Sequence, residues 1–200
     1  MAQEALSRDV EVLRASLPPL PEPLARPVLV VVVGLPGTGK SYFSRRLAER
    51  FPMAVLETDA LRKALFGQPT YSPEESARLF RAVHSLIESL LRRGIPVLLD
   101  ATNLVEANRE HLYHIAEKTG ARLILARTEA PPEVVRERLA RRQQATERED
   151  HSDAGWEVYE RMRRSVDPIR RQHYVVDTTR DIEPALERIL RDIRRWIRIS

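Results

Sequence analysis

The sequence contains no cysteine among its 200 residues. A disulfide framework and a thiolate metal site are therefore excluded. Long apolar runs are also missing, since the longest, Val28 to Val33, has six residues, whereas a membrane-spanning helix needs about 20. The first residues lack the unbroken apolar segment of a signal peptide. We therefore expect a cytoplasmic protein that does not span a membrane, with enough chain for the core of one domain.

Lysine is nearly absent, because the chain carries 30 arginines and three lysines, with a formal net charge of +4. Acidic residues are interleaved with the arginines almost throughout, which is typical of solvated helix faces encoded by a GC-rich genome. A surface evolved for nucleic acid is the alternative interpretation. It is supported by the segment from Arg161 to Arg171, where five arginines accompany one aspartate.

The chain divides into a short leader and a longer α/β region. Residues 1–27 comprise an amphipathic stretch, Glu4 to Leu17, and a segment with five prolines, which predicts a helix on a stiff, extended linker. Over residues 28–200, short apolar runs alternate with segments of 3.6-residue period, which is typical of βα units on a parallel sheet. The expected strands are Val28–Val33, Ala54–Glu57, Ile95–Leu99, Arg122–Arg127 and His173–Val176.

Several helix boundaries carry recognisable signals. Residues 72–75, SPEE, have the serine, the proline and the glutamate of a capping box, so a helix is expected to run from here to about Arg93. Gly120 is expected to end the helix that follows Asn108, and Pro131 and Pro132 to open the next one. The charged stretch of residues 143–155 predicts a mobile loop.

A phosphate-binding loop is the most specific motif in the sequence. Residues 34–41, GLPGTGKS, match G-x-x-x-x-G-K-[ST] at every fixed position, between a buried-type strand and a helix beginning near Lys40. Such a loop wraps a phosphate with backbone N–H groups, which requires glycine at its turning points, and the helix directs its positive end at the same anion. The predicted ligands of a nucleoside triphosphate are Gly34, Leu35, Pro36, Gly37, Thr38, Gly39, Lys40 and Ser41.

Side chains near this loop are assigned to the phosphates and to Mg²⁺. Lys40 is predicted to bridge the β- and γ-phosphate oxygens, and the hydroxyl of Ser41 suits Mg²⁺. Asp100 follows four apolar residues at the end of a strand, where a Mg²⁺-holding carboxylate belongs, although a turn aspartate bonded to its own backbone is the alternative. Tyr42 is either a nucleotide-stacking side chain or part of the core.

Asp59 is the candidate general base. It follows the second strand, in LETDALRK, at the carboxyl edge where the phosphate loop also lies, with Arg62 one turn further on. In phosphoryl transfer to an alcohol, a carboxylate accepts the hydroxyl proton while cations hold the substrate in line. Capping of the helix at Ala60 is the alternative role for Asp59.

Arg138 and Arg142 lie four residues apart and share one face of the helix expected after Pro132. Guanidinium groups there would close over the triphosphate and neutralise charge on the transferred phosphoryl group, as a lid does. An ordinary solvated helix face with Glu133 and Glu137 as partners is the alternative. The spacing does not decide whether Arg141 belongs to the lid.

Seven segments resemble, in order, those of the small P-loop kinases allied to polynucleotide 5′-kinase, zeta toxin and chloramphenicol phosphotransferase. YSPEE and SDA are weak individually, but the seven in one order are specific for the superfamily, and the resemblance covers about residues 28–180. The segments are GLPGTGKS (34–41), TDxxRK (58–63), YSPEE (71–75), VLLDATN (97–103) with Arg109 after it, RERLARR (136–142), SDA (152–154) and VVDT (175–178).

The resemblance implies a P-loop NTPase three-layer α/β/α sandwich with a five-stranded parallel sheet in the order 2-3-1-4-5. It also implies ATP with Mg²⁺ and transfer of the γ-phosphoryl group to a hydroxyl. In that group the aspartate matching Asp59 is the general base, and the arginine matching Arg62 contacts substrate in the polynucleotide-kinase branch. Asn103 and Arg109, which fall in or beside a matching segment, are expected to contact the substrate too.

Further residues are assigned through the same resemblance. Arg138 and Arg142 match catalytic lid arginines, within a lid of about residues 133–155, while Asp177 and Thr178 fall in the loop that borders adenine. The leader, residues 1–27, has no recognised counterpart, so packing, a dimer contact and the remnant of a fusion are all open.

Three functions are compatible with these motifs. The favoured one is an ATP-dependent phosphotransferase acting on a small hydroxyl-bearing molecule, with Asp59 as the base. A polynucleotide 5′-hydroxyl kinase is the first alternative, although the sequence has no aromatic-rich strand on which bases would stack. An ATP-gated binding module without kinase activity is the second. The sequence does not indicate the oligomeric state.

Overall fold

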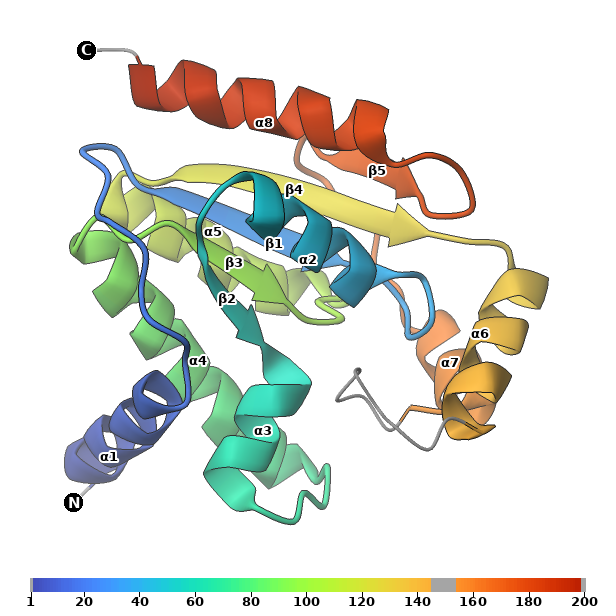
Figure 1. The fold of residues 1–200 in the computed structure, drawn as a ribbon. Helices are drawn as coiled ribbons and strands as arrows, with labels where there is room; N and C mark the ends of the chain where they lie inside the picture. Colours follow the sequence, from blue (N-terminus) through green and yellow to red (C-terminus); the bar gives the residue numbers. More distant parts are fainter. Residues whose placement is uncertain (1, 145–153, 199–200) are drawn as a thin grey trace.

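The computed structural model describes residues 2–144 and 154–198, which contain one five-stranded parallel sheet (Figure 1). The strands are β1 (Val28–Val33), β2 (Ala54–Glu57), β3 (Val97–Asp100), β4 (Arg122–Glu129) and β5 (Tyr174–Asp177). Their spatial order is β2-β3-β1-β4-β5. The predicted fold class and strand order are therefore confirmed.

The strand bounds show where the sequence prediction was inaccurate. β1 and β2 have the predicted ends, but β3 begins after Pro96, because a proline has no N–H to contribute to a ladder. β3 therefore ends on Asp100 itself, so this carboxylate belongs to the last residue of the strand. β4 extends two residues beyond Arg127, and β5 is shifted by one residue, to end on Asp177.

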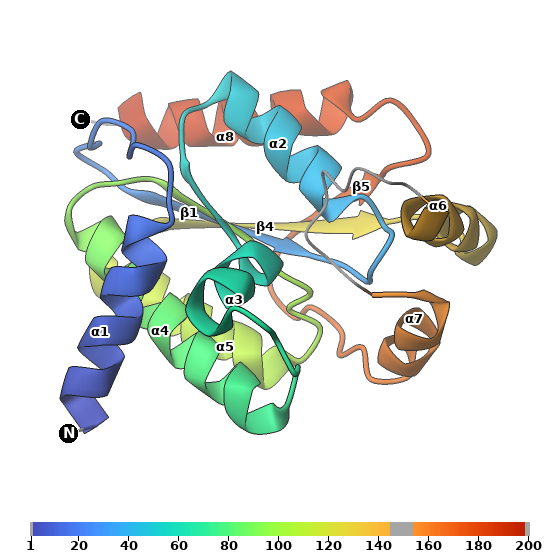
Figure 2. The ribbon, with the colours of Figure 1, turned by 60° about the horizontal axis from the view of Figure 1, so that its bottom comes forward.

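Helices cover both faces of the sheet. In the two views, α2 and α8 lie on one face and α4 and α5 on the other, with α1 outside α4 (Figures 1 and 2). The helices of the described residues are α1 (Ala2–Ala15), α2 (Lys40–Arg50), α3 (Thr58–Phe66), α4 (Pro73–Arg92), α5 (Glu106–Thr119), α6 (Pro132–Gln144), α7 (Trp156–Arg163) and α8 (Glu183–Arg198).

The alternation of β1 explains why the sheet is covered on both faces. All six side chains of β1 are buried. Leu29, Val31 and Val33 belong to the core cluster that contains α4 and α5, whereas Val28, Val30 and Val32 belong to the cluster that contains α2 and α8. Because successive strand residues point to opposite faces, an unbroken apolar run contributes side chains to both layers at once. Among the described residues, no helix is long and apolar enough to cross a bilayer.

The leader packs on the domain. The side chain of Leu13 on α1 is fully buried in the core cluster of α4 and α5. Asp9, which is 6% exposed, accepts two hydrogen bonds from the guanidinium of Arg78 on α4, at 2.6 and 2.7 Å. The linker then runs without helix to β1, and the N–H of Leu24 donates to the carbonyl of Gly94. The leader of residues 1–27 is thus joined to the core by burial and by charge.

Helix caps follow the sequence signals with one exception. Ser72 Oγ accepts a hydrogen bond from the N–H of Glu75 at 3.1 Å, with Pro73 as the first residue of α4, and Gly120 ends α5 in the left-handed conformation. The predicted capping box is incomplete, because the carboxylate of Glu75 does not return to Ser72. It accepts instead from Thr70, Tyr71 and Arg62. This diversion bears on the candidate site below.

Candidate active site

The phosphate loop joins β1 to α2 and depends on glycine for two reasons. Gly37 and Gly39 have φ of 78° and 87°, a conformation that favours glycine. Gly34 has no such angle, but a Cβ there would lie 2.4 Å from Oγ1 of Thr128. A Cβ on Gly37 would lie 2.8 Å from Val135 of α6. The glycines therefore allow both the turn of the loop and the close approach of its neighbours.

The loop that follows β3 fixes the base of the phosphate loop. The N–H of Gly34 donates to the carbonyl of Thr102 at 3.1 Å, and the side-chain amide of Asn103 donates to the carbonyl of Val32 at 3.1 Å. Asn103 has φ of 47° and is 6% exposed. The strained backbone of Asn103 is thus held by a buried hydrogen bond between two strand ends.

Arg109 supports the same loop and is not among the residues that line the cavity. Its guanidinium is fully buried and donates to the carbonyls of Asn103, Asp167 and Pro168 and to the carboxylate of Glu106. The expected substrate contacts of Asn103 and Arg109 are therefore corrected. Asn103 donates to a backbone carbonyl, and Arg109 donates to backbone carbonyls and to Glu106, so both side chains form the scaffold of the site.

The carboxyl ends of three strands meet beside the phosphate loop. Asp100 of β3 is in register with Val32 of β1 and with Glu57 of β2. A cavity of about 580 Å³ opens at this edge. Its lining residues are Pro36, Gly37, Gly39, Lys40, Ser41, Tyr42, Glu57, Thr58, Asp59, Arg62, Tyr71, Ser76, Phe80, Asp100, Ala101, Thr102, Arg142, Ala154, Val158, Arg161 and Met162. Residues far apart in the sequence thus converge on one cavity at the predicted rim.

The donor set at this edge fits Mg²⁺ with a triphosphate. The hydroxyl of Ser41 and the carboxylate of Asp100, which is 4% exposed, both line the cavity. Two protein oxygens beside a phosphate loop suit Mg²⁺, because this ion completes its shell with water and phosphate oxygens. Among residues 2–144 and 154–198, no group of three or more acidic, histidine or cysteine side chains forms a cage for a metal. The arrangement therefore fits a metal that arrives with its nucleotide.

Asp59 lies in the first turn of α3, and its side chain lines the cavity. The helix begins at Thr58 and its N-cap residue is Glu57, so the alternative in which Asp59 caps the helix is wrong. Within the described part of the chain, Asp59 forms no hydrogen bond or ion pair. A half-buried carboxylate at a cavity wall is available to a reacting hydroxyl.

Arg62, one turn along α3, is held by a buried ion pair. Its guanidinium donates to Glu75 at 2.6 Å, both side chains are 8% exposed, and the ring of Tyr71 lies 4.9 Å away. Burial raises the pKa of Glu75, but the hydrogen bonds from Thr70, Arg62 and Tyr71 outweigh it and lower that pKa to about 2. The carboxylate is therefore charged at neutral pH and balances the charge of Arg62.

Arg138 of the predicted lid lies beside the phosphate loop but outside the cavity lining. It donates to the hydroxyl and the carbonyl of Thr178, at 2.8 and 2.9 Å, and to the carbonyl of Gly37 at 3.4 Å. The hydroxyl of Thr178 donates in turn to the carbonyl of Thr38. In this structure Arg138 therefore ties α6 and the end of β5 to the loop. Asp177 also lies outside the cavity, where it accepts from Thr179.

Arg142 does line the cavity, and it donates to the carbonyl of Ala154 at 2.5 Å. Arg141, one residue earlier, has a side chain that is 83% exposed and lies near Glu137. The two arginines predicted for the lid thus have different surroundings. Most of the predicted mobile loop, together with Ser152 and Asp153 of the SDA segment, falls outside the described residues.

The sequence analysis missed the contribution of α7. Val158, Arg161 and Met162 of α7 line the cavity, and Figure 2 shows α7 beside α6. Their spacing of three and four residues places them on one face of the helix, and this spacing was the available signal. Tyr42 was also misjudged in part, because its side chain is 50% exposed at the cavity and the core interpretation is wrong.

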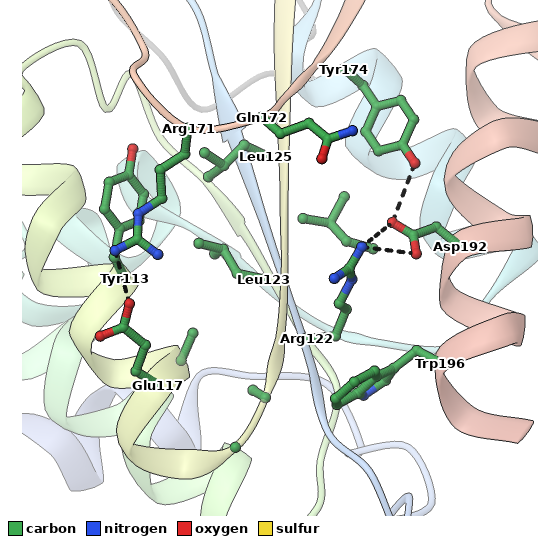
Figure 3. A pocket seen from close by; sticks show the side chains of 14 residues that line it. Tyr113, Glu117, Arg122, Leu123, Leu125, Arg171, Gln172, Tyr174, Asp192 and Trp196 are labelled. Carbon is green, nitrogen blue, oxygen red and sulfur yellow. Dashed lines mark hydrogen bonds and ion pairs between the residues drawn. The ribbon is translucent and has the colours of Figure 1, made fainter. Parts of the chain in front are cut away.

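A second hollow, of about 680 Å³, lies away from the phosphate loop (Figure 3). It follows the first half of β4, which β5 leaves uncovered because β5 pairs with residues 126–129. Figure 3 shows Glu117 and Arg171 at one wall and Arg122 and Asp192 at the other. We call this hollow the β4 groove.

Every charged side chain that lines the β4 groove has a partner of opposite charge. Arg171 pairs with Glu117 at 2.8 Å, and Arg122 pairs with Asp192 at 3.0 Å. Tyr174 donates a further hydrogen bond to Asp192. The groove is larger than the cavity, but it offers no unpaired charge to a ligand and lacks the phosphate loop.

Comparison with known proteins agrees with the geometry. The family model described as AAA domain matches residues 29–169. The fold is similar to a candidate kinase of Chloroflexus aurantiacus, with 22% identity, a TM-score of 0.66, and coverage of 85% of this chain and 97% of that one.

Two further solved structures have the same fold. Kti12 of Chaetomium thermophilum, solved with ADP-AlF3, has 19% identity, a TM-score of 0.68 and coverage of 84% and 98%. The APS kinase CysC of Mycobacterium tuberculosis, solved with AMPPNP and APS, has 20% identity, a TM-score of 0.60 and coverage of 86% and 99%. Because the family model spans most of the chain, from β1 through the phosphate loop to α7, the protein belongs to the AAA domain family and has the fold of a P-loop kinase.

Proposed function

We propose that the protein transfers the γ-phosphoryl group of ATP, with Mg²⁺, to a hydroxyl group of a small molecule. The observation that carries the proposal is the position of Asp59. This carboxylate shares one cavity with Lys40 and Ser41 of the phosphate loop and has no partner among the described residues. A binding module that only holds nucleotide has no need of such a carboxylate in the cavity of the phosphate loop.

Each residue of the cavity has a separate role in the proposed reaction. Backbone N–H groups of the phosphate loop and the ammonium of Lys40 hold the phosphates. Asp59 accepts the proton of the acceptor hydroxyl. The oxygen of that hydroxyl bonds to the γ-phosphorus, and the bond from this phosphorus to the bridging oxygen of ADP breaks. Ser41 and Asp100 would hold Mg²⁺, which neutralises charge on the phosphate oxygens. Arg142 would supply further positive charge from the lid.

The alternative of a polynucleotide 5′-hydroxyl kinase receives less support. It relied on Asp59 with Arg62 and on the arginines from Arg161 to Arg171. Of the latter, Arg163 lies 3.8 Å from Glu160 and Arg171 pairs with Glu117. A phosphate backbone is bound by release of counterions from unpaired cations. This segment therefore presents fewer free charges than the sequence suggests, and we favour a small acceptor.

The experiment is an Asp59→Asn substitution, which keeps the shape of the side chain and removes its basicity. We expect phosphoryl transfer to fall by about 100-fold or more, because a positioned base contributes about 10²–10⁴. Nucleotide affinity should stay within about twofold. Transfer from labelled ATP to a metabolite pool and binding of a fluorescent ATP analogue are measured separately.

An Asp192→Asn variant is the matched control, because it makes the same chemical change in the β4 groove. It should transfer phosphate like the wild type. Full transfer by Asp59→Asn would refute Asp59 as the base, whereas no transfer by the wild type to any acceptor would refute the kinase itself.

A further inference from the structure

The part of the cavity beyond the phosphate loop combines rings, apolar groups and arginine. Tyr71 and Phe80 come from the α3–α4 side, while Val158, Arg161 and Met162 come from α7. Such a surface suits a molecule with an apolar or planar body and a separate charged group.

The positive charge of Arg62 is balanced within the protein by the carboxylate of Glu75. Arg62 is 6% exposed, and its guanidinium donates to Glu75 at 2.6 Å and to the hydroxyl of Ser76 at 3.3 Å and faces the ring of Tyr71. Glu75 in turn accepts two hydrogen bonds from Thr70. An acceptor anion at Arg62 would compete with the carboxylate of Glu75, which already balances the charge of this guanidinium. Arg62 therefore holds the wall of the cavity in place.

Arg161 is in the opposite situation. It lines the cavity, it is accessible to solvent, and within residues 2–144 and 154–198 it has no ion pair or hydrogen bond. Its neighbour Arg163 lies outside the cavity lining and near Glu160. The two arginines on this short helix thus differ in their surroundings, and of the two, Arg161 is the one that is available to a ligand in the cavity.

We propose that Arg161 binds an anionic group of the phosphoryl acceptor, so that the acceptor is an alcohol with a carboxylate or phosphate on an apolar or planar body. The inference rests on the proposed function for the identity of the acceptor hydroxyl. A guanidinium fork binds either anion through two parallel hydrogen bonds. Asp59 and Arg161 then set the orientation, because the hydroxyl is directed to the carboxylate and the anion to the guanidinium.

The test compares two probes that have the same ring and hydroxyl and differ in charge. The protein is saturated with Mg²⁺ and AMPPNP, so that the phosphate loop is filled, and is titrated with 4-(hydroxymethyl)benzoate and with 4-(hydroxymethyl)benzamide. Ligand-observed NMR gives both dissociation constants. We expect the benzoate to bind about tenfold more tightly, as one charge-assisted hydrogen-bonded pair provides. A third titration with 4-(hydroxymethyl)phenyl phosphate tells a preference for phosphate from one for carboxylate.

Three variants assign the preference to a residue. In Arg161→Ala the affinities for benzoate and benzamide should agree within about twofold, whereas Arg163→Ala should keep the wild-type ratio. Arg161→Lys should keep part of it, because lysine retains the charge without the planar fork. Equal affinities in the wild type, the absence of binding included, overturn the proposal, and so does a ratio that survives in Arg161→Ala.

The result is independent of catalysis. Because binding is measured with a nucleotide that is not turned over, the probe preference is readable even if the protein transfers no phosphate. Loss of transfer in Asp59→Asn with an intact probe ratio supports both proposals. An intact ratio without any transfer by the wild type refutes the kinase alone.

Discussion

The cavity and the β4 groove are of similar size and differ in how their charges are balanced. In the groove, both arginines are paired with carboxylates on the opposing helices. In the cavity, Asp59 and Arg161 have no such partner within the described residues, and Lys40 contacts only the carbonyl of Leu35, at 3.2 Å. Unbalanced charge, rather than volume, therefore marks the place where a charged ligand is expected.

The contrast also has a structural cause. The cavity lies at the carboxyl edge of the sheet, where loops leave the strands and helix α2 begins. The β4 groove lies along the side of β4, between α5 and α8, and Figure 3 shows one ion pair at each of its walls. Pairs of this kind shield an open strand edge from other chains. The same sheet thus has one edge adapted for ligands and another closed by ion pairs.

The largest effect is expected at Lys40 of the cavity. Lys40→Ala should lower phosphoryl transfer by about 100-fold or more, because a preorganised cation at the transferred group is lost. The affinity for ATP should fall as well, as measured with a fluorescent analogue. Lys118→Ala is the control, since Lys118 is an exposed lysine paired with Glu88. If the two variants behave alike, the phosphate loop is not where ATP is held.

A smaller effect is expected at Glu75, where the cavity wall is held. Glu75→Gln leaves the buried Arg62 without an opposing charge, so we expect the melting temperature to fall by several degrees. Glu74→Gln, a change of the exposed neighbour, should leave it unchanged. Calorimetry checks both variants.

The pH dependence of this effect has a defined sign. The pKa of Glu75 is lowered from 4.5 to about 2, so its stabilisation is complete above pH 4.5 and is lost as the pH falls toward 2. Urea midpoints of wild type and Glu75→Gln should therefore differ more at pH 7 than at pH 3. A difference that grows at low pH would contradict the charged pairing.

The smallest effects are expected in the β4 groove. Arg122→Ala and Glu117→Ala each remove one partner of an exposed pair and should change the free energy of unfolding by about 1 kcal/mol or less. Phosphoryl transfer should equal that of the wild type. A large loss of transfer in either variant would break the contrast and make the groove part of the function.

The sequence predicted the residues whose chemistry is local. The phosphate loop, Ser72 as a cap and the strand positions follow from short patterns, because each depends on neighbours in the chain. Asp59 and Asp100 were placed at the rim because they end or follow strands of a parallel sheet. These assignments required only the positions of the strands in the sequence and their parallel direction.

The remaining residues depend on contacts between distant segments. Arg109 was expected at the substrate, but its partners are carbonyls at positions 103, 167 and 168, which no pattern links to it. Arg161 was noted only as part of a basic segment, because the cavity wall that it forms depends on how α7 packs. Arg62 is paired, whereas Arg161 has no partner among residues 2–144 and 154–198, and this distinction appears only when the structure is considered.

The docking of α1 has a practical consequence for anyone who trims the chain to the part with recognised motifs. A version that starts at β1 would uncover the apolar side chains beneath Leu13 and remove the carboxylate that neutralises Arg78. A newly exposed apolar surface on α4 favours aggregation in solution. The leader, which carries no recognised motif, should therefore be retained when the protein is produced.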